Sequence, residues 1–327
     1  MREPRSIRSF SRSRERRTVG PFRKVKQLAL MSILVIGNAV LDRSFLVDRL
    51  PYPGETMIAR DSRVDCGGKG LNQAVAAARA GATVTLHAMV GDDEPGRKIL
   101  AALREEQMVL PANPIRSGPT DEATVLLLPG GENSIICSAH ATAHIDLQSG
   151  LTALEHFGSD DWLISQGNTD RATTEDTLLC ARRRNVRTIV NPSPPLFDYT
   201  GLWPMIDILI LNAGEARTLG GHDDFDLAAA RMLGFGCHKI IITLGPDGAR
   251  IYGSDQQRHC SVAAPEMKIA DTTGAGDTCC GVMAAGLDAG LDLESAVAWG
   301  VRCATLKATR WGSLSALPSR EEIDRLR

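Results

Sequence analysis

An eight-residue polar segment near the C-terminus has the composition of an anion-binding site. It reads Asp271-Thr272-Thr273-Gly274-Ala275-Gly276-Asp277-Thr278 and precedes small apolar residues at positions 281–287, a pattern typical of a closely packed helix. Glycines at a helix start leave backbone N–H groups accessible, and the positive end of the helix dipole adds to their attraction for an anion. Asp277 is a carboxylate inside this site, so it is either a cap of the helix or a general base.

A second glycine-containing segment, Gly67-Gly68-Lys69-Gly70-Leu71-Asn72-Gln73, precedes an alanine-rich helical stretch at residues 74–82. Its glycines allow a ligand to approach the backbone closely. The segment is neither a P-loop nor the Gly-x-Gly-x-x-Gly sequence of dinucleotide-binding folds, because both spacings are absent. Asn72 lies one turn into the helix and faces either the same ligand or solvent.

Short apolar runs predict the strands that position these segments. They occur at residues 33–36, 83–90, 162–165, 188–191, 206–211 and 239–243. Helical patterns lie at residues 96–107, 174–185 and 226–235. From about residue 150 the two types alternate, which is typical of βαβ units in a parallel sheet covered on both faces.

Two hairpin-like excursions, at residues 45–64 and around residues 129–133, interrupt the alternation in the first half of the chain. The predicted fold is therefore α/β, with a doubly wound, mostly parallel sheet between helices and a small β lid. Asp42 follows the first strand, where the carboxyl ends of parallel strands bind ligands. It is either a ligand contact or a turn residue.

The charge of the chain is unevenly distributed. Ten of the 37 Lys and Arg residues and only two of the 39 acidic residues fall within the first 30 of 327 positions. The remainder is acidic, which argues against binding to nucleic acid. No apolar run approaches the roughly 20 residues that span a bilayer. The eight cysteines contain no Cys-x-x-Cys pair, so we expect reduced thiols in a cytoplasmic protein.

The first 30 residues are rich in Arg and Ser and show no apolar periodicity before Leu28. A disordered basic arm, an organelle transit peptide and an untranslated upstream extension all fit this composition. Because Met31 directly precedes a clean strand, we favour an extension or a disordered arm. We expect a single domain over residues 31–327.

Two widely separated segments together resemble the ribokinase-like (PfkB) carbohydrate kinases, most closely the ribokinase branch. One is Pro53-Gly54-Glu55-Thr56 followed by residues 67–78, and the other is residues 271–278. The resemblance runs from about residue 33 to the C-terminus. It implies a mostly parallel sheet with helices on both faces and a β lid, at about residues 40–66 and 120–138, that closes over a sugar.

The resemblance also implies roles for individual residues. Asp277 corresponds to the base that takes a proton from the attacking sugar hydroxyl. Gly274, Ala275 and Gly276 correspond to an anion hole that stabilises charge on the transferred phosphoryl group. The implied sugar-contacting positions are Asp42, Gly67, Gly68, Lys69, Asn72 and Asn168.

On the nucleotide side, the resemblance assigns Asn212 and Glu215 to a motif that organises Mg²⁺ and phosphates through water. Asn191 lies near the same phosphates in relatives. The implied nucleotide loop contains Thr243, Gly245 and Gly248, although an ordinary β-turn explains these residues equally well. Asp271 and Thr273 resemble part of a monovalent-cation site, which suggests K⁺ in addition to ATP and Mg²⁺.

Several positions depart from the ribokinase pattern. Val40 stands where ribokinases have an asparagine, and Asn168 stands where they have a glutamate. Because buried hydrogen-bonding sites discriminate strongly, these changes argue against D-ribose as the substrate. Cys279 replaces a common phenylalanine, and the cation site is incompletely matched near Trp311-Gly312-Ser313.

The sequence therefore predicts an ATP-dependent kinase that phosphorylates a hydroxyl, expected to be primary, of a small sugar or sugar-like polyol. A ribonucleoside kinase is the alternative within the enzyme class. A catalytically silent sugar-binding regulator is the alternative outside it, and the intact Asp277 argues against it. The resemblance also suggests a homodimer formed through the lid.

Overall fold

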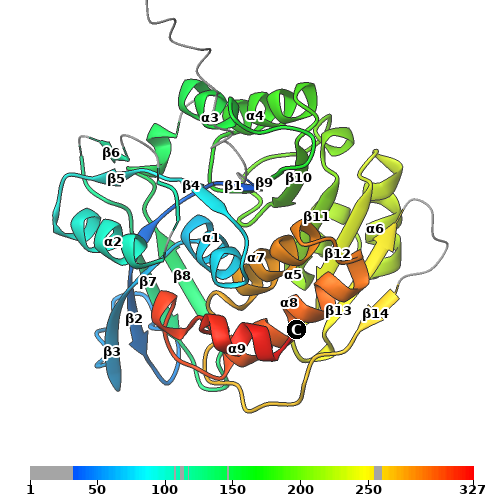
Figure 1. The fold of residues 1–327 in the computed structure, drawn as a ribbon. Helices are drawn as coiled ribbons and strands as arrows, with labels where there is room; N and C mark the ends of the chain where they lie inside the picture. Colours follow the sequence, from blue (N-terminus) through cyan, green and yellow to red (C-terminus); the bar gives the residue numbers. More distant parts are fainter. Residues whose placement is uncertain (1–31, 107, 111–113, 117, 146, 254–259) are drawn as a thin grey trace, which may run out of the picture. The chain divides into compact units, whose positions relative to one another are not determined.

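The computed structural model describes residues 32–327 except 107, 111–113, 117, 146 and 254–259 (Figure 1). Residues 31–327 form one compact unit. The predicted basic extension at residues 1–30 lies outside the described residues.

An eight-stranded sheet forms the centre of this unit, in the order β14-β13-β12-β11-β10-β9-β1-β4. From β4 to β12 all neighbours are parallel, while β13 and β14 run antiparallel at one edge. The strands are β1 (Ile33–Ile36), β4 (Val84–His87), β9 (Trp162–Gln166), β10 (Arg187–Asn191), β11 (Ile208–Asn212), β12 (Lys239–Thr243), β13 (Ala249–Gly253) and β14 (Cys260–Val262).

The predicted α/β fold with a mostly parallel sheet is confirmed. Consecutive side chains of β1 show why its sequence is apolar throughout. Ile33 and Val35 pack into the core on one face of the sheet, and Leu34 and Ile36 pack into the core on the other. A strand buried on both faces leaves no position for a polar residue.

Helices cover both faces (Figure 1). One face packs against α1 (Lys69–Arg79), α2 (Glu94–Glu105), α7 (Ala275–Asp288) and α8 (Leu293–Ala308). The other packs against α3 (Leu147–Leu154), α4 (Arg171–Arg183), α5 (Ala213–Gly220) and α6 (Phe225–Gly234). The short helix α9 (Arg320–Arg325) packs on α8 through Ile323. Among the helices that the structure describes, none is long and apolar enough to cross a bilayer.

One predicted strand was wrong at its end. The expected strand at residues 83–90 stops at His87, and Val90 belongs to β5 (Val90–Gly91), which pairs with β6 (Ile115–Arg116) in a separate two-stranded sheet. An apolar run does not reveal where a chain leaves one sheet for another.

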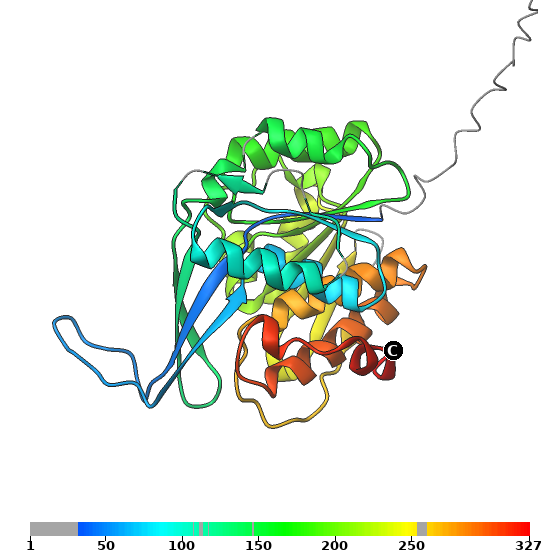
Figure 2. The same ribbon diagram turned by 60° about the vertical axis from the view of Figure 1, so that its left-hand side comes forward.

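A second sheet of four strands has the order β3-β2-β7-β8. Its strands are β2 (Val40–Leu46), β3 (Asp61–Gly67), β7 (Glu122–Leu127) and β8 (Asn133–Cys137). We call it the small sheet. Figure 2 shows that the connection between β2 and β3, drawn in blue, extends away from the rest of the unit.

Close packing of α7 on α1 sets the distance between the two glycine-containing segments. A Cβ atom on Gly281 would lie only 2.3 Å from the backbone oxygen of Gln73. Glycine therefore allows the two helices to approach at this position, because any side chain would collide with backbone. This contact brings the start of α7 next to the start of α1.

Candidate active site

Asp277 is a buried carboxylate in the first turn of α7. The N-cap of this helix is Gly274, in a left-handed conformation with φ of 73°, so Asp277 is not the cap. The two carboxylate oxygens accept hydrogen bonds from α1 instead, from Asn72 Nδ2 at 3.3 Å and from Gln73 Nε2 at 3.0 Å. Two amide donors from another helix thus orient the carboxylate.

Gln73 connects Asp277 to the ends of neighbouring strands. Its Nε2 also donates to Asn191 Oδ1 at 3.1 Å, and its Oε1 accepts from Gln166 Nε2 at 2.8 Å. Asn191 in turn donates to the backbone oxygen of Ile210 at 2.9 Å. The result is a continuous chain of side-chain hydrogen bonds across the carboxyl ends of β9, β10 and β11.

Sequence reasoning missed Gln73 and Gln166 as site residues. Both side chains are 0% exposed. The available signal was the position of Gln166 directly after the apolar run at residues 162–165, since an amide buried with that run must find partners.

The start of α7 has the open backbone expected of an anion-binding site. Gly276 is exposed, and no atom lies within 4 Å of the place where its Cβ would stand. The amide of Ala275, however, already donates to the backbone oxygen of Thr272 at 3.1 Å. Of the predicted anion-hole residues, Gly276 is therefore the one that the structure leaves most accessible.

Asp42 lies on β2 at the base of the small sheet and is 5% exposed. It accepts a hydrogen bond from the Ser313 hydroxyl, and a Cβ on Gly67 would lie 2.0 Å from its Oδ2. Burial raises the pKa of Asp42 to about 7, while the hydrogen bond from Ser313 acts in the opposite direction. The carboxylates of Asp65, Asp277 and Asp271 raise the pKa further.

The other predicted sugar contacts lie around the start of α1 and the end of β9. Gly68 is the N-cap of α1 with φ of 102°, and Lys69 is the first residue of the helix. Buried polar atoms without a hydrogen-bond partner among the described residues include Asn72 Oδ1, Gln166 Oε1 and both amide atoms of Asn168. Such atoms favour a ligand that supplies the missing hydrogen bonds.

On the predicted nucleotide side, Asn212 and Glu215 bond to one another. Asn212 is the N-cap of α5 and Glu215 its third residue, and together they form a capping box with both hydrogen bonds at 2.9 Å. This arrangement satisfies backbone donors at the helix start. It also fixes Asn212 and Glu215 beside the carboxyl end of β11.

Residues 243–248 form the tight turn that joins β12 to the antiparallel β13. The Leu244 amide donates to the Gly248 oxygen at 2.7 Å, and Thr243 Oγ1 donates to the Leu211 oxygen at 3.2 Å. Gly245 and Gly248 both have positive φ, and a Cβ on Gly248 would lie 1.9 Å from the Val262 oxygen. The turn is thus required by the fold whether or not it contacts a nucleotide.

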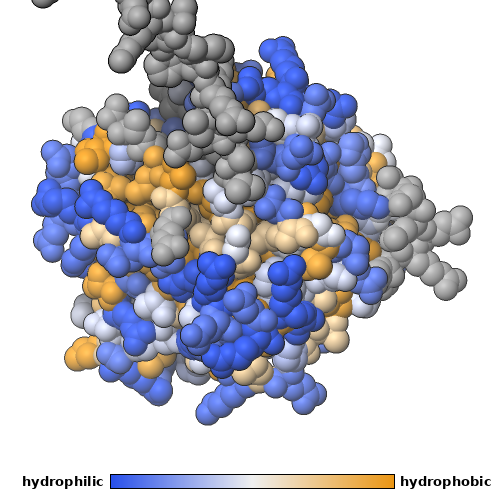
Figure 3. Space-filling view, in the orientation of Figure 1, coloured by the Kyte–Doolittle hydropathy of each residue, from blue (hydrophilic) through white to orange (hydrophobic). Residues whose placement is uncertain are grey.

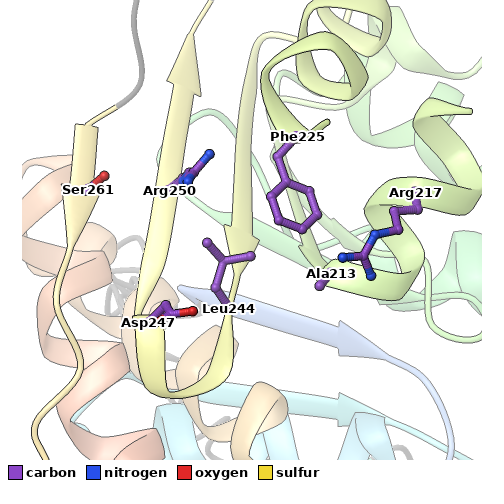
Figure 4. A pocket seen from close by; sticks show the side chains of 7 residues that line it. All are labelled: Ala213, Arg217, Phe225, Leu244, Asp247, Arg250 and Ser261. Carbon is purple, nitrogen blue, oxygen red and sulfur yellow. The ribbon is translucent and has the colours of Figure 1, made fainter. Parts of the chain in front are cut away.

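A cavity of about 360 Å³ lies beside this turn (Figure 4). Its lining comprises Ala213, Arg217, Phe225, Leu244, Asp247, Arg250 and Ser261. Figure 4 shows the Phe225 ring between the two arginines, whose guanidinium carbons lie 5.1 and 5.8 Å from the ring centroid. Neither Asp277 nor its hydrogen-bond partners Asn72 and Gln73 line this cavity.

Asp271 joins the loop before α7 to the segment after α8. Its Oδ1 accepts from the Thr273 amide at 2.8 Å, and its Oδ2 accepts from the Gly312 amide at 3.1 Å. Thr273 Oγ1 accepts from Asn133 Nδ2 of the small sheet at 2.9 Å. Lys307, which sequence reasoning did not select, donates to the backbone oxygen of Asp271 at 3.2 Å.

The structure therefore brings together an oriented buried carboxylate, an open helix N-terminus and a small sheet beside them. A carboxylate beside an anion-binding helix N-terminus is an arrangement that suits phosphoryl transfer. Residues 31–320 match the family described as pfkB family carbohydrate kinase. The chain belongs to this family and is a carbohydrate kinase.

Individual relatives are similar over most of their length. The ribokinase of Bacillus subtilis is 32% identical over 311 residues, which cover 91% of this chain and 99% of that protein. The ribokinase structure from Thermotoga maritima has a TM-score of 0.80 at 28% identity, covering 90% and 98% of the two chains. The Arabidopsis thaliana ribokinase complexed with ribose and ATP has a TM-score of 0.77 at 25% identity, covering 90% and 98%.

Proposed function

We propose that this carbohydrate kinase transfers the γ-phosphoryl group of ATP to a primary hydroxyl of a small sugar or sugar-like polyol, with Asp277 as the general base. The observation that carries the proposal is the environment of Asp277. Two amide side chains hold the buried carboxylate beside the exposed backbone of Gly276. A base next to an anion-binding helix N-terminus suits proton removal during phosphoryl transfer.

In this mechanism Asp277 accepts the proton of the sugar hydroxyl as its oxygen attacks the γ-phosphorus. A new P–O bond forms to the sugar while the bond to the β-phosphate oxygen breaks, which yields the sugar phosphate and ADP. The amides at the start of α7 stabilise the charge on the transferred group, with Gly276 the most accessible. The hydrogen bonds from Asn72 and Gln73 keep the carboxylate aimed at the hydroxyl.

Asn191, Asn212 and Glu215 would face the phosphates of ATP at the ends of β10 and β11. The capping box uses Oε2 of Glu215, so the other carboxylate oxygen is left for water around Mg²⁺. Mg²⁺ retains several waters, which suits an indirect contact of this kind. When bound, the ion would neutralise charge on the phosphates.

The sugar would bind between the small sheet and the start of α1, with Asp42 and Asn72 as polar contacts. Val40 is buried and pairs with Gly67 on the neighbouring strand, so β2 has an apolar residue at the position where ribokinases have an amide. Asn168 offers an amide where they have a carboxylate. These two differences support a substrate other than D-ribose.

A coupled ATPase assay of the purified protein with Mg²⁺ tests the proposal against pentoses, deoxypentoses, hexoses, polyols and nucleosides. We expect one sugar or polyol to give strong turnover, and Asp277→Asn to lower kcat by about 10³-fold, because general bases contribute roughly 10² to 10⁴. Asp324→Asn, at an exposed aspartate of α9, is the matched control. Full activity of Asp277→Asn would exclude Asp277 as the base, and preference for a nucleoside would exclude the sugar assignment.

The small sheet would act as a lid in a homodimer that forms through its exposed apolar side chains. Val64 and Ile136 on its outer strands are 51% and 76% exposed, and Ile58 in the connection of β2 to β3 is 94% exposed. Figure 3 shows isolated apolar residues, in orange, among hydrophilic ones at the lower left, where Figure 1 places this sheet. A monomeric mass by light scattering at micromolar concentration would contradict the dimer.

The protein would act in the cytoplasm with its thiols reduced. Each cysteine whose side chain the structure describes is free of a disulfide bond. Several of these thiols are buried, Cys279 and Cys280 among them, and burial raises the pKa of Cys279 to about 12. Thiol titration of the protein purified without reductant tests this, since oxidised pairs would contradict it.

A further inference from the structure

Lys307, beside the candidate site, is a fully buried lysine, whereas lysine side chains ordinarily lie in water. This lysine of α8 is 0% exposed, and its ammonium lies 3.2 Å from the backbone oxygen of Asp271 and 3.8 Å from Asp271 Oδ2. An ammonium without water is costly unless negative groups compensate for the lost hydration. The negative groups around the ammonium of Lys307 must therefore be identified.

The surroundings of Lys307 are strongly negative. Carboxylates of four residues act on its ammonium, namely Asp271, Asp277, Asp65 and Asp42. Burial lowers the pKa of Lys307, while all four carboxylates oppose that effect and favour the charged form. They come from the small sheet, from the loop before α7 and from α7 itself, so one buried cation serves three parts of the site.

Lys307 also lies directly behind the start of α7. Its Cε is 3.8 Å from the place where a Cβ of Gly274 would stand. The next residue, Ala308, accepts hydrogen bonds from the amides of Ala270 at 2.8 Å and Asp271 at 3.1 Å. The end of α8 thus holds the loop from residue 270 to 274, which leads into the open N-terminus of α7.

A monovalent metal ion at the predicted Asp271 and Thr273 site does not fit these residues. Both carboxylate oxygens of Asp271 already accept backbone hydrogen bonds, and its carbonyl oxygen accepts from Lys307. An ion bound to these oxygens would lie within a few ångströms of the ammonium, where two like charges repel strongly in a poorly solvated interior. The lysine and the ion therefore exclude one another.

We infer that the ammonium of Lys307 is an internal cation that replaces K⁺ behind the anion-binding start of α7, so that phosphoryl transfer is independent of K⁺. Lys307 is then a positioning residue. Through Asp271 it holds the loop that presents Gly274 and Gly276, and its charge adds to the positive end of α7. The inference rests on the proposed function, because it concerns the same site.

The first test uses the unmodified protein. The kcat for the best sugar is measured in K⁺-free buffer and in 100 mM KCl, with N-methylglucamine chloride keeping the ionic strength constant. We expect the two values to agree within about twofold, since the cation is built in. A tenfold or larger stimulation by K⁺ would overturn the inference, and this test does not depend on any variant folding.

The second test removes the ammonium. We expect Lys307→Ala to lower kcat by about 10²-fold, as is typical when a catalytic loop is misplaced. Added K⁺ or NH₄⁺ should raise the kcat of this variant at least tenfold, whereas Li⁺ should not. Lys98→Ala, at an exposed lysine of α2, is the control and should show neither loss nor rescue. A folded Lys307→Ala variant that no cation rescues would contradict the inference.

Cation binding distinguishes this inference from the proposed function. Thallium-205 NMR reports a Tl⁺ site directly, and K⁺-specific thermal stabilisation reports it indirectly. We expect both signals in Lys307→Ala and neither in the unmodified protein. If no substrate is turned over, the proposed function fails, yet these signals still test the internal cation. A K⁺-selective Tl⁺ site in the unmodified protein would refute it.

Discussion

The two sides of the candidate site differ in how far along the chain their contacts reach. On the Asp277 side, the carboxylate is held by Asn72 and Gln73, which are 205 and 204 residues away in the sequence. On the proposed nucleotide side, Asn212 and Glu215 are three residues apart and would form their capping box in any α-helix with this start. The first arrangement exists only in the folded protein, and the second is local.

This difference predicts where substitutions act. A change in the long-range network alters the geometry of the reacting groups, because no local structure restores it. A change in the local motif costs some stability of one helix, and the rest of the fold compensates. Three substitutions test this contrast, in decreasing order of expected effect.

The largest effect is expected for Gln73→Met, which keeps the volume of the side chain but removes both amide donors of Gln73. We expect kcat to fall by about 10²-fold with little change in KM for ATP, because Asp277 and Asn191 each lose a donor. Steady-state kinetics measures this split. Gln148→Ala, at an exposed glutamine, should be neutral. A kcat of Gln73→Met within twofold of the unmodified protein would show that Asp277 needs no orienting amide.

An intermediate effect is expected from the titration of Asp42. Its pKa is raised to about 7 in the folded protein from an ordinary value of 3.8, so between these values the folded state holds a proton that the unfolded state has released. The free energy of unfolding therefore falls as pH rises from about 4 to about 7, by at most about 1.4 kcal/mol per pH unit. Four other groups share this environment: Asp65, Asp271, Asp277 and Lys307.

Urea denaturation of the unmodified protein and Asp42→Asn across this pH range measures the effect. As pH increases, we expect the free energy of unfolding to fall more for the unmodified protein than for Asp42→Asn. The reason is that the asparagine amide, unlike the Asp42 carboxyl group, has no proton to lose. Parallel stability curves would mean that Asp42 is ionised throughout, and the burial argument for its raised pKa would be wrong.

The smallest effect is expected for Asn212→Ala, which removes the N-cap of α5. Loss of a cap costs about 1 kcal/mol of stability. Ser319→Ala breaks the corresponding capping box of α9 and is the matched control. If Asn212 also faces the nucleotide, only Asn212→Ala should raise KM for ATP, by a few fold. Equal KM values for the two variants would make Asn212 purely structural.

Much of the fold could be predicted because its signals are local. The apolar runs of β1 and β9 to β12 reflect burial on both faces, and the turn between β7 and β8 reflects its Pro and Gly residues. The edge strands β13 and β14 were not predicted, since short antiparallel strands at a sheet edge have no comparable apolar run.

The sequence by itself determined the family, the carbohydrate kinase class and the positions of the two glycine-containing segments, because each segment is a short run of consecutive residues that can be recognised without knowing the fold. Only the tertiary structure decided that Gln73 bonds to Asp277 and that Lys307 is buried against Asp271. Lysine in an amphipathic helix ordinarily lies in water. Its burial depends on carboxylates from three other parts of the chain, and only folding brings these together.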